Sequence, residues 1–259
     1  MPHESGASSI HGTVVNGSSA FAHDDSMSAP DDKFTSQRAF FGRRKGHPLR
    51  PRQAALFDTL LPRLALDLTH PPPADLRALF AAAPDDVRLE IGFGGAEHLI
   101  GQAKANPHGG FIGSDAFVNA MAKALAAIDA GKLANIRLHF GDASALIEWL
   151  PPASLARIDL LYPDPWPKRR HWKRRFIQDE SLARLGRILR PGGELRFATD
   201  IADYAAWTLA RVLRSKEFVW TAERADDWRK PWADFSATRY ETKAKREGRV
   251  PAYFVFRRE

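Results

Sequence analysis

The chain has 259 residues, of which 44% are hydrophobic and 27% are charged, and its formal net charge is +7. This length and hydrophobic content are enough for one large α/β domain or two small ones. No apolar run approaches the ~20 residues of a membrane span, and the absence of cysteine excludes a disulfide framework and a thiolate metal site. Residues 1–33 hold five acids and one base, whereas the rest of the chain carries 37 bases against 26 acids, or +11. A basic body of this kind predicts a polyanionic partner, with nucleic acid favoured over a membrane.

Residues 1–36 are predicted to form a disordered N-terminal extension, because the stretch to about Lys33 is rich in Ser, Gly, His and Asp without a sustained apolar period. It lacks the charged start and apolar core of a signal peptide, and its acids argue against a transit peptide. A basic arm, QRAFFGRRKGHPLRPR (37–52), then opens the single domain expected over residues 37–259. This arm has three interpretations: a linker, an RNA-contacting arm or a nuclear-localisation patch.

Strands and helices alternate through the domain. Strands are predicted at 87–93, 109–115, 135–142, 157–164 and 192–200, with helix-like stretches such as 117–129 and 176–189 between them. This alternation predicts a parallel sheet with helices on both faces. Near the C-terminus, EFVWTAE (217–223) and AYFVFRR (252–258) are two further strands that we expect to form an antiparallel edge, with no full helix between them. The long segment that joins these two strands is of a length that is commonly functional.

The segment YPDPWPKRRHWKRR (162–175) places a single acid, Asp164, ahead of six cationic side chains. Proline fixes its own φ and biases the residue before it toward extended geometry, so we expect Asp164 to lie on a stiff, non-helical segment. The alternative is an ordinary proline-rich loop followed by a solvated helix. Trp166 is expected either to stack on a flipped base or to anchor the loop in the core, and we favour the core. His171 fits a phosphate contact better than a catalytic base.

Carboxylates gather where the predicted strands end. Asp115, Asp142, Asp164 and Asp200 each end or follow a strand, and Glu90 precedes the turn GFGG (92–95). Ligands bind outside the carboxyl ends of the strands in an open α/β sheet. A single acid there is usually a helix N-cap, but five on one edge are hard to explain in that way. The end of the sheet at which these strands terminate is therefore predicted to be a binding site.

The GFGG turn is neither the dinucleotide fingerprint nor a phosphate-binding loop, and a pyrophosphate would be repelled by the surrounding acids. S-adenosylmethionine fits better, because its sulfonium, ammonium and ribose diol all suit carboxylate acceptors. Asp115 is expected to hold the ribose hydroxyls, and Asp142 lies where the adenine amino group would be. Glu90 is expected to meet the methionine end or to orient its loop.

The motifs LEIGFGGAEHL, HFGDA, YPDPWPKRRHWKRR, ATD and TRYETK resemble, in order and spacing, those of the bacterial tRNA (guanine-N7-)-methyltransferases, from about residue 37 to 258. The resemblance implies the class I S-adenosylmethionine methyltransferase fold. This is a Rossmann-like α/β sheet of about seven strands, mostly parallel with the last strand antiparallel, and with helices on both faces. Two motifs depart from the family, since GSD stands where Gly-Ile-Glu is usual and TRYE where Thr-Lys-Phe-Glu is common; both changes preserve the chemistry.

The resemblance also assigns residues. It implies cofactor contacts at Glu90, Gly92, Asp115 and Asp142, a catalytic and guanine-contacting role for Asp164, substrate contacts at Lys168, Asp200, Thr238, Arg239, Tyr240 and Glu241, and RNA contacts at Arg170, His171, Trp172, Lys173, Arg174 and Arg175. The implied reaction transfers the methyl group of S-adenosylmethionine to N7 of guanine-46 in the variable loop of tRNA, in the cytoplasm.

Guanine N7 carries a free lone pair, so the reaction needs alignment and charge stabilisation more than a strong base. An arginine on O6 and N7 would block the nucleophile, and Asp164 is therefore expected to accept the N1 and N2 protons of guanine. The rival functions are a small-molecule methyltransferase and a non-catalytic RNA-binding protein. We expect no metal, because neither His98 nor His139 has a second ligand at metal spacing. A monomer and a homodimer both stay open.

Overall fold

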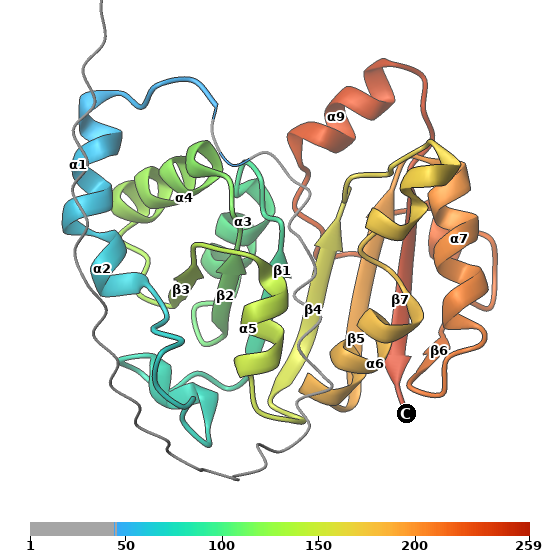
Figure 1. Cartoon of the computed structure of the whole chain (residues 1–259), viewed down its shortest axis with the longest axis horizontal. Helices are drawn as coiled ribbons and strands as arrows, with labels where there is room; N and C mark the ends of the chain where they lie inside the picture. The colour runs from blue at the N-terminus through green and yellow to red at the C-terminus, as the bar shows by residue number, and fades with distance from the viewer. Residues whose placement is uncertain (1–43, 45) are drawn as a thin grey trace, which may run out of the picture. The chain divides into compact units, whose positions relative to one another are not determined.

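A seven-stranded sheet in the order β3-β2-β1-β4-β5-β7-β6 organises the chain (Figure 1). The computed structural model describes residue 44 and residues 46–259, so the predicted extension, its boundary and part of the basic arm lie outside the described residues. The first five strands are parallel, and β7 is antiparallel to both β5 and β6. The predicted fold is confirmed. The strands are β1 (Val87–Ile91), β2 (Gly110–Ser114), β3 (Ile136–His139), β4 (Leu155–Leu161), β5 (Leu189–Thr199), β6 (Phe218–Trp220) and β7 (Ala252–Arg258).

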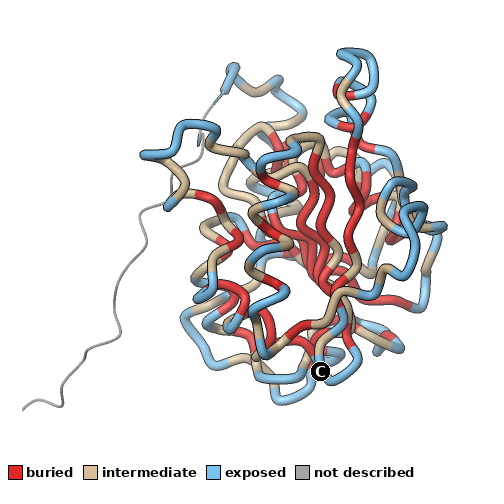
Figure 2. Tube along the Cα trace, turned by 90° about the vertical axis from the view of Figure 1, so that its right-hand side faces the viewer, coloured by how far each residue is buried: buried red, intermediate tan, exposed pale blue. Residues whose placement is uncertain are grey.

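Helices cover the sheet in two groups, each with its own apolar cluster. Leu99 of α3 and Leu125 of α4 pack with Leu138 of β3, whereas side chains of α5, α6 and α7 pack with β1, β4 and β5. The strands are thus buried between exposed layers (Figure 2). None of the described helices is long and apolar enough to cross a bilayer. The helices are α1 (Pro51–Thr59), α2 (Leu61–Leu64), α3 (Glu97–Ala105), α4 (Val118–Gly131), α5 (Ala143–Trp149), α6 (Asp179–Ile188), α7 (Ala202–Val212), α8 (Asp226–Arg229) and α9 (Arg239–Arg246), with two 3₁₀ helices, η1 (Leu76–Leu79) and η2 (Arg169–Arg174).

The segment between β6 and β7 differs from the prediction, because it contains a complete helix. The Thr238 side chain accepts a hydrogen bond from the backbone N–H of Glu241 and caps the start of α9. Glu241 and Ala244 form its buried face. The expectation of no full helix was wrong because this helix is mostly charged, and its short buried face gives little apolar periodicity. In Figure 1, α9 stands at the end of the sheet toward which the β4 arrow points.

The proline-rich segment after β4 also departs from expectation in its backbone. Tyr162 and Trp166, which precede Pro163 and Pro167, have φ values of 50° and 43°. Extended geometry before these two prolines was therefore a wrong prediction. A left-handed φ is strained for an aromatic residue and persists only where surrounding contacts hold it, and such outliers gather at functional sites.

Candidate active site

Parallel pairing brings the carboxyl ends of β3, β2, β1, β4 and β5 to one edge of the sheet. Asp142, Asp115, Asp164 and Asp200 follow four of these strands, and the 92–95 turn follows the fifth. The structure therefore groups the strand-end acids around the switch point between β1 and β4, where the sheet reverses its winding.

The turn after β1 is tied to the acid after β2. Gly92 and Gly94 have φ values of 71° and 52°, which a side chain would strain. The backbone N–H of Gly94 donates to Oδ2 of Asp115 at 2.8 Å, and that of Phe117 donates to Oδ1 at 2.8 Å. A Cβ added at Gly92 would meet no atom of the described residues within 4 Å. Burial raises the pKa of Asp115, and the charge of Asp164 adds to the increase, which places both carboxyl groups in one electrostatic environment.

Asp142 caps the helix that follows β3. Its Oδ1 accepts a hydrogen bond from the backbone N–H of Ser144 at 2.9 Å, at the start of α5. The neighbouring His139 is buried, and its Nδ1 lies 3.0 Å from Oγ of Ser114. Asp142 is therefore an ordinary helix N-cap, and the capping hydrogen bond holds its carboxylate at the carboxyl end of the sheet, close to the end of β2.

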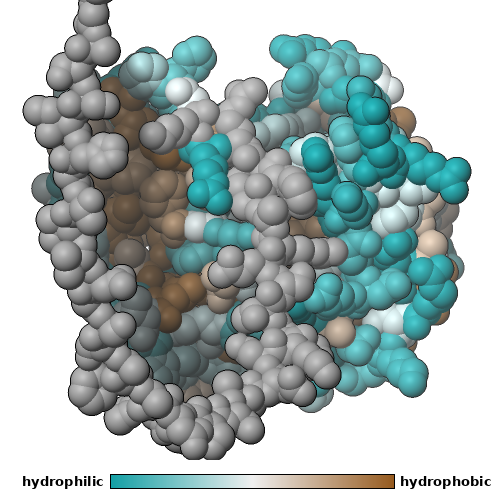
Figure 3. Space-filling view, in the orientation of Figure 1, coloured by the Kyte–Doolittle hydropathy of each residue, from teal (hydrophilic) through white to brown (hydrophobic). Residues whose placement is uncertain are grey.

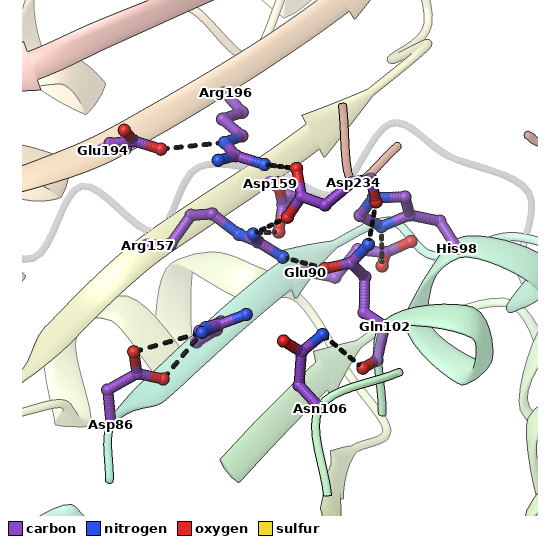
Figure 4. Close-up of polar contacts among 11 residues, drawn as sticks. Asp86, Glu90, His98, Gln102, Asn106, Arg157, Asp159, Glu194, Arg196 and Asp234 are labelled. Atoms are coloured by element: carbon purple, nitrogen blue, oxygen red, sulfur yellow. Dashed lines mark hydrogen bonds and ion pairs between the residues drawn. The ribbon is translucent and has the colours of Figure 1, made fainter. Parts of the chain in front are cut away.

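Glu90 is buried and paired rather than open to the edge. Its Oε2 lies 2.8 Å from Nδ1 of His98, which comes from the first turn of α3 (Figure 4). Burial raises the pKa of Glu90. Burial alone would lower the pKa of His98, but the Glu90 carboxylate outweighs it and raises that pKa. The pair fastens the strand before the glycine turn to the helix after it.

A second polar network lies near this pair and joins β4 to β5 (Figure 4). Arg157 is buried and donates from Nε to Asp159 at 2.9 Å and from Nη1 to Asp234 at 2.8 Å. Arg196 binds the other oxygen of Asp234 at 2.6 Å. Gln102 accepts from Arg157 at 2.6 Å and donates to the main-chain carbonyl of Asp234. Asp234 is therefore held by both its side chain and its backbone, four residues before Thr238.

Sequence reasoning missed Asp234 and its two arginines. A signal was present, because Arg157 and Asp159 alternate within an otherwise apolar strand and so face the same side of the sheet. Charged residues on a buried strand are seldom unpaired. The partner could not be identified because it lies 77 residues away in the chain.

The predicted substrate motif at 238–241 lies beside the glycine turn. The Arg239 guanidinium pairs with Glu97 at 3.0 Å, and the Tyr240 ring would meet a Cβ added at Gly94 at 3.1 Å. Glu241 is buried, and its Oε1 accepts from the Tyr253 hydroxyl at 2.6 Å and from Lys245 at 2.5 Å. The start of α9 thus touches the turn at the end of β1.

The predicted substrate residue Asp200 has a protein partner, since its Oδ2 accepts from Nε of Arg249 at 2.5 Å. Burial raises the pKa of the nearby Tyr162, and the charges of Glu241 and Asp200 contribute. The ends of β4 and β5 and the start of α9 therefore share one charged neighbourhood.

Asp164 follows β4 and is exposed, and desolvation raises its pKa. The Trp166 ring is half-buried beneath the Arg174 guanidinium, at 4.9 Å from the ring centroid, and lies edge-on to His171 at 5.8 Å. Desolvation and neighbouring cations lower the pKa of His171. The side chains of the basic segment that are exposed are Lys168, Arg169, Arg170 and Lys173.

Arg175 does not lie on this surface, although the sequence predicted that it contacts RNA. The side chain is fully buried and lies among the rings of Trp172, Tyr204 and Trp207. Trp172, also predicted to contact RNA, packs edge-on against Trp207 at 5.3 Å and is half-buried. The basic run alone could not reveal this difference, because the cage is completed by α7.

Figure 3 shows a strongly hydrophilic surface on the side of the molecule that carries α6, α7 and α9. A hollow of about 440 Å³ lies along α9 and is lined by Arg239, Tyr240, Thr242, Lys243 and Arg246. No group of three or more His, Cys, Asp or Glu side chains that could hold a metal occurs among residues 44 and 46–259.

Comparisons with known proteins agree with this geometry. Residues 84–253 match a family described as putative methyltransferase. The chain is 63% identical to the tRNA (guanine-N(7)-)-methyltransferase of Rhodopseudomonas palustris (strain BisB18), over 86% of this chain and 88% of that protein. It is 59% identical to the enzyme of the same name from Bradyrhizobium diazoefficiens, over 88% and 96% of the two chains. The crystal structure of the 16S rRNA methyltransferase KamB covers 68% of this chain and 89% of its own, with 18% identity and a TM-score of 0.50, and shows the shared fold. The chain belongs to the tRNA (guanine-N(7)-)-methyltransferase family.

Proposed function

We propose that the chain transfers the methyl group of S-adenosylmethionine to N7 of a guanine in tRNA, in the variable loop at guanine-46, and that it does so in the cytoplasm. The observation that carries this proposal is the meeting of two kinds of carboxylate at one sheet edge. Asp115 is tied to the glycine turn, whereas Asp164 is exposed beside a run of exposed cations. The Asp115 carboxylate suits a cationic cofactor. The Asp164 carboxylate suits a guanine base of a nucleic acid whose phosphates bind the neighbouring cations.

The residues present fit S-adenosylmethionine. The carboxylate of Asp115 and the backbone at Gly92, where an added Cβ would meet no atom of the described residues, would hold the ribose and the methionine part. Asp142 would lie beside the adenine. Glu90 would act through its pair with His98, by fixing the turn rather than by reaching the ligand. When bound, this cofactor supplies an electrophilic methyl group.

Asp164 is the residue that we assign to the guanine. As a carboxylate it would accept the N1 and N2 protons of the base and offset the positive charge that grows on the purine. The strained backbone at Tyr162 and Trp166 fits a loop that holds one carboxylate in a fixed direction. No side chain has to remove a proton, because N7 attacks with its own lone pair.

The tRNA would lie across the basic segment and α9. Lys168, Arg170 and Lys173 are exposed and would hold phosphates, which sets the position of the guanine. Arg239 and Tyr240 border the 440 Å³ hollow and touch the glycine turn, so they would meet the nucleotide closest to the cofactor.

Methylation of bulk tRNA by the purified full-length chain, followed by mapping of the modified nucleotide, tests the proposal. The expected product is N7-methylguanosine in the variable loop. Binding of S-adenosylmethionine without any tRNA binding would favour a small-molecule methyltransferase, and tRNA binding without cofactor binding would favour a non-catalytic RNA-binding protein.

A further inference from the structure

The buried arginine at the end of the basic segment lies in an aromatic cage built by two separate parts of the chain. The centre of the Arg175 guanidinium is 5.0 Å from the Trp172 ring, 5.0 Å from the Tyr204 ring and 4.9 Å from the Trp207 ring. The side chain has no exposed surface, and Nη2 pairs with the Asp203 carboxylate. Aromatic faces of this kind attract cations and are a common way to bind a cationic ligand, but here the chain's own arginine fills the cage.

The walls of the cage are themselves fastened. The Trp207 indole N–H donates to the carbonyl of Ile177 at 2.8 Å. The Gln178 amide donates to the carbonyls of Trp172 at 2.9 Å and Arg175 at 3.1 Å. The segment around Arg175 is therefore locked to α7, and the guanidinium is held in one position rather than being free to follow a phosphate.

One donor of this fixed guanidinium points back to the loop that carries Asp164. Nε of Arg175 donates to the main-chain carbonyl of Pro165 at 2.9 Å. That carbonyl belongs to the peptide unit that joins Pro165 to Trp166, and rotation of this unit changes the φ of Trp166, which is 43°. The hydrogen bond thus acts on the strained torsion of Trp166, two residues after Asp164.

We propose that Arg175 is a positioning residue, which holds the Pro165 carbonyl and thereby fixes the direction of the Asp164 carboxylate, and that it is not a phosphate contact. This inference rests on the proposed function of Asp164. A strained φ persists only where its surroundings over-determine it, and the caged guanidinium provides such a constraint. The basic segment then has two parts: exposed cations that hold the nucleic acid, and one buried cation that holds the catalytic loop.

The test compares Arg175→Met with Lys173→Met, in the full chain and with bulk tRNA. Arg175→Met keeps the apolar volume of the cage but loses the charge and the donor. We expect kcat to fall by roughly 10- to 100-fold, while the dissociation constant for tRNA and the slope of its logarithm against the logarithm of salt concentration stay unchanged. Lys173→Met should instead weaken tRNA binding and flatten that slope by about one. A flattened slope with unchanged kcat in Arg175→Met would overturn the proposal.

A second comparison separates positioning from general loss of structure. If Arg175 acts through Asp164, adding Arg175→Met to Asp164→Ala should cause little further loss of kcat, whereas multiplying losses would overturn the proposal. Arg175→Lys keeps the charge but not the Nε donor and should recover only part of the activity. If Arg175→Met does not fold, Asp203→Asn replaces it, and an unchanged kcat in that variant would refute the anchoring role. If the wild-type chain forms no N7-methylguanosine, the proposed function fails, while the salt slopes still decide whether Arg175 meets phosphate.

Discussion

Two segments border the end of the sheet that carries the strand-end acids, and they are fastened to the fold in different ways. The segment 162–168 after β4 is held by a buried cation in an aromatic cage, with Arg175 bound to the carbonyl of Pro165. The segment 232–241 before and within α9 is held by ion pairs, with Asp234 between Arg157 and Arg196. Each lock pairs a buried arginine with a partly exposed aspartate: the Arg175 side chain has no exposed surface and its partner Asp203 is 56% exposed, whereas Arg157 is 6% and Asp234 43% exposed. The two locks therefore differ in the groups around the arginine, since aromatic rings enclose Arg175 whereas polar side chains bind Arg157.

The two key carboxyl groups also differ in their response to pH. Desolvation raises the pKa of Asp164. Partial burial acts in the same direction on Asp234, but Arg196 and Arg157 outweigh it and lower the pKa. As pH falls, Asp164 is thus protonated before Asp234. The stability that Asp234 contributes is present above its unfolded pKa and is lost only as pH falls through its lowered folded pKa, so it does not change near neutrality.

The largest expected effect comes from Asp164→Asn, which keeps the shape of the side chain but removes its charge. We expect kcat and kcat/KM to fall together by about 10²–10³, as for the loss of a preorganised electrostatic partner. Binding of each substrate should stay close to that of the wild type. Steady-state methylation of tRNA together with equilibrium binding measures both quantities.

The pH profile sharpens this prediction. The wild-type rate should decline on acidification at a higher pH than an ordinary Asp would give, since the raised pKa of Asp164 favours the protonated form. The deficit of Asp164→Asn should change little from about pH 6 to 9, because no proton is removed there. Near wild-type turnover in this variant would mean that the carboxylate is structural and that residues 238–241 select the guanine.

Asp115→Ala removes the carboxylate that binds the glycine turn after β1. Loss of charge-assisted hydrogen bonds should weaken binding of S-adenosylmethionine by roughly 1.5–3 kcal/mol, whereas tRNA affinity should be nearly unchanged. Calorimetry would measure the affinity for S-adenosylmethionine, and a filter-binding assay would measure the affinity for tRNA. Unaltered cofactor binding would show that the ribose is held elsewhere.

Reversal of Arg170 and Lys173 to Glu tests the exposed part of the basic segment. Both side chains are exposed, and Arg175 is left in place. We expect weaker tRNA binding and a salt slope that is flatter by about one for each lost phosphate contact. Cofactor affinity should stay within about twofold, since both residues belong to the basic segment and neither is part of the glycine turn or a strand-end acid. An unchanged salt slope would mean that these side chains only face solvent.

The sequence was sufficient for the fold and for the strand-end acids, because both depend on local patterns. Buried strands and glycine turns recur at βα spacing, and each acid follows its strand directly. Arg174 and Arg175, in contrast, are adjacent and chemically identical, yet one covers the Trp166 ring and the other is sealed by α7. Their difference depends on a helix that begins 27 residues later, which no local pattern contains. The role of Asp234 could not be predicted for the same reason, because its partners lie on strands far away in the chain.

The smallest expected effect comes from Asp234→Asn, which tests the second lock. Arg157 keeps Asp159 and Gln102 as partners, and Asp234 is partly exposed, so we expect a loss of only about 1 kcal/mol in the free energy of unfolding. The KM for tRNA should rise about threefold to tenfold with kcat less affected, because the start of α9 is loosened while Asp164 stays in place. Glu194→Gln is the matched control, since Glu194 also pairs with Arg196, at 2.9 Å, but has no contact with the segment before α9 among the described residues. An equal rise in KM in the control would show that the charge of Arg196, rather than the anchoring of α9, governs tRNA use.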